Sequence, residues 1–175
     1  MKDIGKTTVF GIFHRSAMSS GVMPVAEFSI EKYCGRWYEI GRMDFFWEKK
    51  SLTNVYVDYA INAEGTVDVK NTGFNEKSEK WSSYEGEARF RADNNIAALE
   101  VTFFGGAWAG YNVVSVDENY QYALVYGRNL DYLWMLSRNR AMPPSIKEKY
   151  LAMARETGYD ISKINWPSQD KEIED

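Results

Sequence analysis

The sequence has few of the residues that build disulfide frameworks, metal sites and nucleophilic relays. Its 175 residues include one cysteine, Cys34, and one histidine, His14. A single cysteine cannot form an internal disulfide, so the fold must rest on its core. His14 lies in the N-terminal tail, which argues against a His–Cys or Ser–His relay and against a histidine-based metal or haem site. We therefore expect no catalytic residue, no metal and no cofactor.

Long hydrophobic runs and clustered positive charge are also missing. No segment approaches the roughly 18 apolar residues of a membrane-spanning helix. The apolar stretch 9–13 is too short for the core of a secretory signal, and no cysteine precedes Cys34 to carry a lipid anchor. The net charge is −4 and the isoelectric point is near 5.2, with no local cluster of lysine or arginine. The net negative charge and the lack of a basic cluster argue against nucleic acid as a partner.

Aromatic residues, in contrast, make up 15% of the chain, and hydrophobic residues 45%. Between Trp37 and Arg138, apolar and polar residues alternate in short runs separated by turn residues. Because every connection is short, neighbouring runs should pair as antiparallel hairpins, and about eight strands can close a barrel around one small ligand. The expected strands cover residues 37–46, 54–62, 65–74, 79–91, 96–104, 110–117, 120–127 and 131–138.

The sequence thus predicts an all-β fold, an eight-stranded antiparallel up-and-down β-barrel with one C-terminal α-helix packed outside. Ser145 and Glu148 have the spacing of a capping box and predict a helix over 145–157 that ends at Gly158. Two late strands are apolar on both faces, so this helix should cover their outer face. We expect a flexible tail over 1–27, one barrel domain over 28–166 with a short edge strand at 161–166, and an acidic, frayed tail over 167–175.

Strand alternation also indicates which side chains face the lumen or its mouth. These are mostly aromatic, and such a lining suits an acyl chain, since each buried methylene contributes about 0.8 kcal/mol. Glu39, Arg42, Asn71, Asn112 and Ser115 are candidates for contacting a polar head group at the mouth. The residues expected to bind the ligand are Met43, Tyr59, Tyr84, Phe90, Phe103, Trp108, Tyr111 and Trp134.

Two residues are expected to close one end of the barrel. Trp37 stands at the start of the first strand and Arg138 at the end of the last. In a closed barrel these positions are neighbours, so the guanidinium can lie over the indole face. We expect this contact to be structural, forming a floor beneath the lumen.

Several segments resemble motifs of the lipocalin family. Residues 33–40 contain Gly-x-Trp-Tyr-Glu, like the motif that opens the first lipocalin strand; Asp131-Tyr132 is similar to the second motif and Arg138 to the arginine of the third. The likeness is closer to bacterial outer-membrane lipocalins than to apolipoprotein D and plant temperature-induced lipocalins. It runs through segments 103–105, 110–113, 120–124 and 158–162 and covers roughly residues 28–166.

This resemblance implies a carrier of fatty acids or lysophospholipids, with Trp134 at the position of the family's pocket tryptophan. It implies a place in the bacterial cell envelope, at the outer membrane or in the periplasm, with peripheral membrane association, although the sequence shows no lipobox and no convincing signal peptide. The residues that it assigns to the structural floor are Gly35, Trp37, Asp131, Tyr132 and Arg138.

Two alternatives stay open at this point. One is an enzyme on the same barrel, an isomerase or hydrolase of apolar substrates, for which Glu39 with a tyrosine is the available acid–base pair. The other is a filled barrel that acts as an interaction module or homodimer through exposed aromatics such as Trp47, Trp81 and Trp108.

Overall fold

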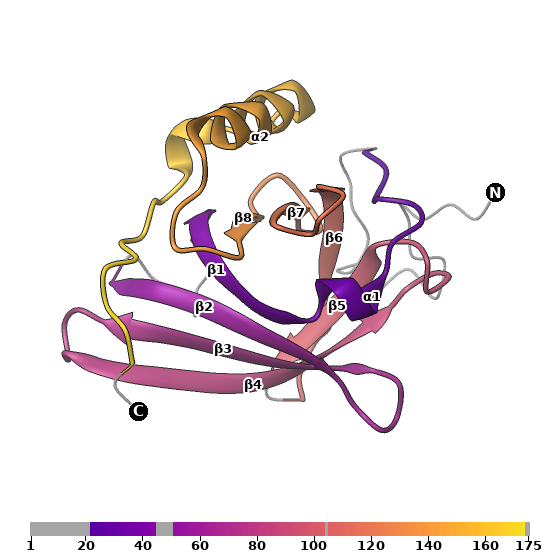
Figure 1. The fold of residues 1–175 in the computed structure, drawn as a ribbon, viewed down its shortest axis with the longest axis horizontal. Coiled ribbons are helices and arrows are strands. Elements are labelled where there is room, and N and C mark those ends of the chain that lie inside the picture. The colour runs from indigo at the N-terminus through magenta and orange to yellow at the C-terminus, as the bar shows by residue number, and fades with distance from the viewer. Residues whose placement is uncertain (1–21, 45–50, 104, 174–175) are drawn as a thin grey trace.

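The computed structural model describes residues 22–44, 51–103 and 105–173, and its eight strands form a closed barrel in sequence order. Each strand pairs antiparallel with the next, and the last pairs with the first, as Figure 1 shows. The predicted eight-stranded up-and-down barrel is therefore confirmed. Its strands are β1 (Gly35–Arg42), β2 (Leu52–Ile61), β3 (Val67–Asn75), β4 (Lys80–Phe90), β5 (Ala98–Phe103), β6 (Ala109–Val116), β7 (Tyr122–Tyr126) and β8 (Leu133–Ser137).

The alternation that predicted the strands also separates the two faces of the wall. On β3, Val67 and Val69 are buried while Asp68 and Lys70 between them are exposed. Successive side chains on a strand point to opposite faces, so the valines fill the barrel and the charges meet water. The same alternation on β5 turns Leu99 inward.

Irregularities in β1 and β2 interrupt this alternation near one end of the barrel. The pairing of β1 with β8 shifts between Glu39 and Gly41, and the pairing of β2 with β3 shifts between Thr53 and Tyr56. An extra residue in a strand exchanges the inward and outward faces beyond it. Met43 therefore lies on the outside of the barrel, buried beneath the C-terminal helix, and not at the mouth as predicted.

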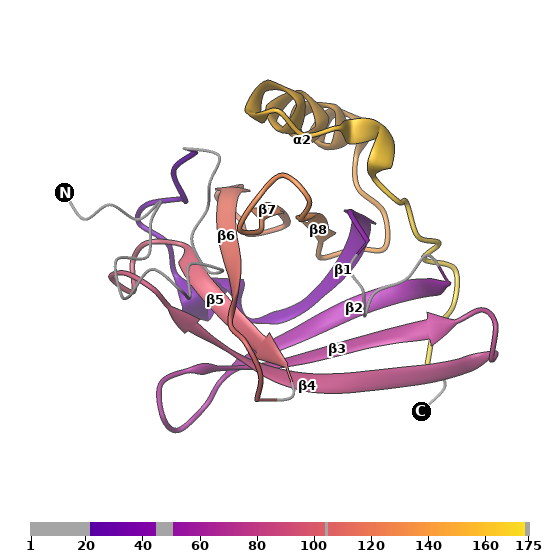
Figure 2. The ribbon, with the colours of Figure 1, turned by 180° about the vertical axis from the view of Figure 1, so that it is seen from behind.

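Helix α2 (Pro144–Thr157) lies over the outer face of β7 and β8, as predicted, in both Figure 1 and Figure 2. Its buried residues Tyr150 and Ala154 share one apolar cluster with outward-facing residues of the last strands. The helix ends at Gly158, whose φ of 110° is left-handed and suits glycine. The capping-box prediction is wrong, because the cap is Pro143, without a side-chain hydrogen bond, and Ser145 already lies in the first turn.

The segment after α2 is held against the barrel, so the prediction of a frayed tail from residue 167 is wrong. The carbonyl of Ser168 accepts a hydrogen bond from Asn54 N at 2.7 Å, and the Gln169 amide donates to the carbonyls of Glu39 and Val55 at 2.9 and 2.8 Å. Figure 1 shows this segment crossing the ends of β1 and β2. In place of the predicted edge strand there is a 3-10 helix, η1 (Ile161–Lys163), followed by a single bridge from Asn165 to Arg42.

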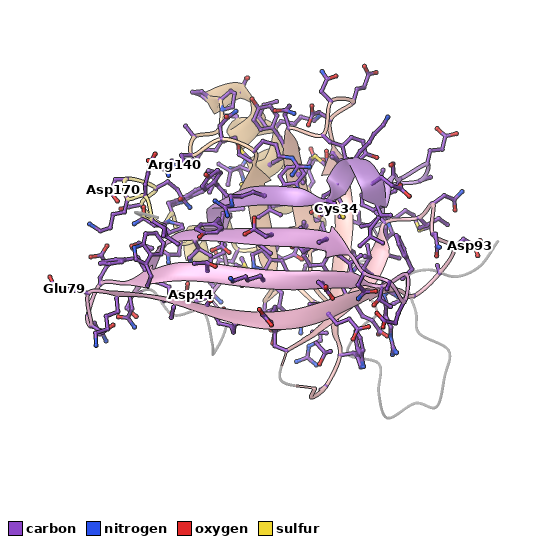
Figure 3. All side chains as sticks on the ribbon, turned by 60° about the horizontal axis from the view of Figure 1, so that its bottom comes forward. Cys34, Asp44, Glu79, Asp93, Arg140 and Asp170 are labelled. Atoms are coloured by element: carbon purple, nitrogen blue, oxygen red, sulfur yellow. The ribbon has the colours of Figure 1, made fainter. Side chains whose placement is uncertain are left out.

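The short helix α1 (Ile30–Tyr33) and the residues before it close the other end of the barrel. Val25 N donates to the carbonyl of Val113 at 2.9 Å, and the Val25 carbonyl accepts from Ala97 N at 2.9 Å. The ordered barrel domain therefore begins upstream of residue 28; residues 1–21 of the predicted tail lie outside the described part of the chain. In Figure 3, Cys34 after α1 lies at the opposite end of the barrel from Glu79 in the β3–β4 turn. No helix within the described ranges is long and apolar enough to cross a membrane.

Candidate ligand-binding cavity

A cavity of about 60 Å³ lies inside the barrel, above a packed lower core. Strands from all around the wall contribute to it, and most of the contributed side chains are apolar. Of the predicted ligand-binding residues, four line it: Tyr59, Phe103, Tyr111 and Trp134. The remaining lining residues are Glu39, Val55, Tyr56, Val57, Val69, Asn71, Val101, Ala109, Gly110 and Leu136.

The floor beneath the cavity is built on Trp37 and Arg138. Trp37 is fully buried, and the Arg138 guanidinium carbon lies 3.8 Å from the centre of its ring. Arg138 also donates to the carbonyls of Arg36 at 2.9 Å, Lys32 at 2.8 Å and Tyr120 at 3.0 Å. One side chain thus ties α1, the start of β1 and the β6–β7 turn together.

Gly35 leaves room for this arrangement. Its φ of 96° is left-handed, and a β-carbon there would lie 3.3 Å from Arg138 Nη1. A side chain at this position would be strained by the backbone and would crowd the guanidinium. Gly35 therefore belongs to the floor through its lack of a side chain.

Asp131 and Tyr132, assigned to the floor from the resemblance, lie at the other end of the barrel. They precede β8, whose far end carries Arg138, so the length of the strand separates them from Trp37. Tyr132 instead approaches Arg128, whose guanidinium carbon is 5.5 Å from its ring centre.

The segment that actually joins the floor is the β6–β7 turn, which the sequence interpretation missed. The Asp117 carboxylate accepts hydrogen bonds from the backbone N–H groups of Gln121 and Tyr122, both at 2.7 Å. Tyr120 accepts from Ser29 N at 2.9 Å, at the N-terminus of α1. The sequence feature that could have identified this turn is the spacing of Asp117 and Tyr120 just before a strand.

Three tyrosines meet at the base of the cavity, and we call them the phenol triad: Tyr59 and Tyr111, which line the cavity, and Tyr33, which lies beneath them. Tyr59 donates a hydrogen bond to the Tyr111 hydroxyl at 2.8 Å, and the hydroxyls of Tyr33 and Tyr111 lie 2.7 Å apart. Burial raises the pKa of Tyr111 well above its usual value, and burial likewise raises that of Tyr33. Tyr33 and Tyr111 are therefore protonated and uncharged at neutral pH.

Trp134 and Phe103 form much of the wall above the triad. The Trp134 ring lies 6.0 Å from the Tyr111 ring, centre to centre. Phe103 lies across from Gly86, where a β-carbon would come within 2.6 Å of the phenyl ring. The missing side chain on β4 is thus what allows Phe103 to occupy this position.

The other predicted ligand-binding residues lie away from the cavity. Phe90 faces inward but packs in the lower core, 6.3 Å from the Phe28 ring, and Tyr84 contacts Phe103 edge-on at 5.3 Å. Trp108 stacks on the Arg89 guanidinium at 3.9 Å. Ala109 lines the cavity, so alternation turns the residue before it outward, and Trp108 covers the outside of β4.

One ion pair stands in the wall beside the cavity. Arg42 Nη1 lies 2.7 Å from a carboxylate oxygen of Glu39, and both side chains are almost completely buried. Arg42 also contacts Asp44 at 3.2 Å and donates to the carbonyl of Leu52 at 3.1 Å. Glu39 also lines the cavity, so the carboxylate side of this ion pair is the side that faces it. The described residues contain no cluster of three or more histidine, cysteine or carboxylate side chains placed to share a metal ion.

Comparison with known proteins agrees with this architecture. Residues 28–169 match the family model of the lipocalin-like domain. The chain is 40% identical over 149 residues to the outer membrane lipoprotein Blc of Citrobacter freundii, covering 85% of this chain and 84% of that protein. It is 32% identical over 155 residues to apolipoprotein D of Rattus norvegicus, covering 83% and 80%.

A solved structure with the same fold is insecticyanin from the tobacco hornworm Manduca sexta. It matches with a TM-score of 0.67 and 18% identity, over 89% of this chain and 87% of that one. At this identity the likeness shows the fold alone. Together with the family model and the relatives, it shows that this chain is a member of the lipocalin family.

Proposed function

We propose that the protein binds and carries a small hydrophobic ligand inside the barrel, with a fatty acid or a lysophospholipid as the ligand. The observation that carries this proposal is the cavity itself, apolar on most sides, with Tyr111 and Trp134 in its wall and the Trp37–Arg138 floor beneath. Membership of the lipocalin family supports binding of a small hydrophobic ligand in general. The acyl chain is inferred from the aromatic and aliphatic lining.

The size of the cavity sets a condition on how such a ligand enters. Pockets that hold drug-sized molecules measure about 300–1,000 Å³, whereas this cavity measures about 60 Å³. A long chain must therefore displace lining side chains. Trp134 and Phe103 are partly exposed and stand at the wall, so their rotation would open the most room.

The energetics of an acyl chain allow this cost. A chain of about sixteen carbons gains roughly 12 kcal/mol from burial, at about 0.8 kcal/mol per methylene. Binding also has unfavourable terms of several kcal/mol, which come from the loss of translational freedom, the ordering of the chain and the displacement of side chains. The remainder, about 8 kcal/mol, corresponds to micromolar binding.

We also propose that the protein acts in the bacterial cell envelope. Relatives from Citrobacter freundii and Vibrio cholerae, at 40% and 36% identity, are outer membrane lipoproteins. Membranes are the source of single-chain lipids, so a carrier there would meet its ligand directly. Peripheral contact with the membrane would then be the route of transfer.

A binding role is favoured over an enzymatic one by the state of Glu39. Its carboxylate is engaged by Arg42 at 2.7 Å, which holds it as a structural ion pair. The outer aromatics also have partners, which gives no support to a hydrophobic docking patch. Trp81 packs edge-on against Phe74 at 5.5 Å, and Trp108 lies on Arg89. Trp47 lies outside the described residues.

Titration of the protein with hexadecanoic acid and with a lysophospholipid, followed by tryptophan fluorescence, tests the proposal. We expect saturable quenching or a spectral shift, and weaker binding after Trp134→Ala. Trp108→Ala is the matched control, because that indole lies on the outer wall, and it should leave the affinity unchanged. Equal affinities for both variants and the wild type would remove Trp134 from the site.

A further inference from the structure

The phenol triad holds one more hydroxyl proton than its own hydrogen bonds use. Each phenol carries a single proton, so the three residues carry three. The Tyr59 hydroxyl donates a hydrogen bond to Tyr111. The hydrogen bond between Tyr33 and Tyr111 uses one of the two remaining hydroxyl protons. The last proton, on Tyr33 or Tyr111, has no acceptor among the residues that the structure describes.

A donor buried in this way is costly unless something accepts its proton. The side chains of Tyr33, Tyr59 and Tyr111 are 2%, 8% and 8% exposed, so bulk water does not reach them freely. Buried polar groups in folded proteins nearly always have a partner, and a buried donor without one is destabilising. The proton left on Tyr33 or Tyr111 therefore calls for an acceptor that none of the described residues supplies.

Two cavities adjoin the triad, and their sizes differ. The lower one is about 10 Å³, lined by the three phenols and apolar side chains such as Leu99. A water molecule needs at least about 10–15 Å³ and two or more polar partners, so the lower space barely admits one. The upper cavity, about 60 Å³, is lined by Tyr59 and Tyr111. The upper cavity is therefore the one that can hold an acceptor.

The charge around the cavities constrains the acceptor further. Among the described residues that line either cavity, Glu39 is the one charged side chain, and it is negative. Its partner Arg42 is already engaged by Glu39, Asp44 and the Leu52 carbonyl, and no lysine or arginine is among the described residues that line either cavity to neutralise an anion. A carboxylate ion at this depth would be desolvated without a counter-ion, which is strongly unfavourable. Burying an uncharged carbonyl oxygen costs far less free energy, and this oxygen can still accept the hydrogen bond.

Building on the proposed ligand-binding function, we propose that the phenol triad donates a hydrogen bond to an uncharged carbonyl oxygen of the ligand. The cavity thereby favours long-chain ketones, aldehydes and methyl esters, entering carbonyl end first, over carboxylate ions. A fatty acid meets the same requirement in its protonated form.

The test compares 2-decanone with 2-methyl-1-decene, which has the same shape but a CH₂ group in place of the carbonyl oxygen. Dissociation constants for both come from displacement of Nile red, in the wild type and in the Tyr33→Phe/Tyr59→Phe/Tyr111→Phe variant. The quantity of interest is the ratio of the alkene constant to the ketone constant, because differences in water solubility cancel between the two proteins. We expect the ratio to fall about two- to tenfold in the triple variant, the worth of one hydrogen bond.

Tyr126→Phe is the matched control. Its hydroxyl contacts Thr157 beneath α2, on the outer side of the barrel wall, so the wild-type ratio should persist. Removing all hydroxyls of a hydrogen-bonded group while keeping the rings is close to neutral for stability. If the triple variant does not fold, Tyr59→Phe/Tyr111→Phe serves instead. It leaves only Tyr33, which lines the lower cavity and not the upper one.

A second readout observes the bond itself. The infrared carbonyl stretch of bound 2-decanone should lie at lower frequency in the wild type than in the triple variant. An unchanged ratio together with an unchanged stretch would overturn the proposal of a carbonyl site. If neither compound displaces Nile red from the wild type, and fatty acid does not quench its tryptophans either, the proposed binding function itself fails.

Discussion

Replacing Arg138 by methionine should strongly destabilise the protein, because this side chain holds the floor of the barrel together. Its guanidinium lies 3.8 Å from the Trp37 ring centre and donates to carbonyls from α1, β1 and the β6–β7 turn. Methionine keeps much of the apolar stem but removes the charge and every donor. The perturbation therefore isolates the polar and cation–π contacts from simple packing.

The expected magnitude follows from those contacts. The cation–π contact contributes about 1–2 kcal/mol when partly desolvated. Hydrogen bonds from a charged donor contribute about 1.5–3 kcal/mol each, but carbonyls near the surface regain water when the donor is lost. A net loss of about 3–5 kcal/mol is reasonable. For a domain of this size, each kcal/mol lowers Tm by about 2–4 °C, so Tm should fall by roughly 6–20 °C.

Urea unfolding followed by tryptophan fluorescence measures this loss, and Arg140→Met is the matched control. Arg140 is two residues further along; it pairs at 3.0 Å with Glu172, whose side chain is mostly exposed, and its guanidinium carbon lies 5.5 Å from the Tyr38 ring centre. Exposed ion pairs contribute about 0–1 kcal/mol, so the control should stay within that range. If Arg138→Met unfolds at the same urea concentration as Arg140→Met, the floor does not depend on the guanidinium and the reasoning is refuted.

The remaining predictions concern the cavity, the C-terminal segment and alkaline pH. Gly86→Ala should cost about 1–3 kcal/mol in thermal unfolding, because its β-carbon would overlap both the Thr102 carbonyl oxygen and the Phe103 ring; a variant as stable as the wild type would contradict the close approach of β4 and β5 at this position. Gln169→Ala should cost about 1–2 kcal/mol and speed hydrogen exchange in β1 and β2, because its amide donates to carbonyls of both strands. Stability should be complete below pH 10 and fall as pH rises toward 12, since burial raises the pKa of Tyr150 to about 12 and the folded state resists its ionisation. Tyr150→Phe should reduce that alkaline loss without abolishing it, because burial also raises the pKa of Tyr33 and Tyr111; an unchanged pH profile would exclude Tyr150 as a contributor.

Much of the barrel could be predicted from sequence because alternation is a local property. The runs around Val67 and Leu99 place apolar side chains on one face whatever the rest of the chain does. Chain order then fixes the pairing, since short turns allow only hairpins between neighbours. The meeting of Trp37 and Arg138 follows from closure alone, because the first and last strands must be neighbours in a closed barrel.

The sequence-based predictions were wrong where a strand bulge, or a contact between segments distant in the sequence, changes the local pattern. The bulge after Glu39 exchanges the two faces of β1, so counting by two placed Met43 on the wrong side of the wall. Tyr33 was missed as a cavity residue because it lies in α1, outside any strand alternation, and reaches Tyr111 only through the fold. The C-terminal segment looked like a solvated tail, since the hydrogen bonds of Gln169 fill gaps that no sequence pattern reveals.

Native mass spectrometry tests the central claim of a ligand inside the barrel most directly. Protein stripped of lipid is mixed with a lysophospholipid or with hexadecanoic acid at micromolar concentration, and the complexes are weighed intact. The account predicts a complex of one protein with one ligand, weakened by Trp134→Ala and not by Trp108→Ala. Protein that stays free of both lipids across this range would show that the barrel is a filled core and would contradict the account.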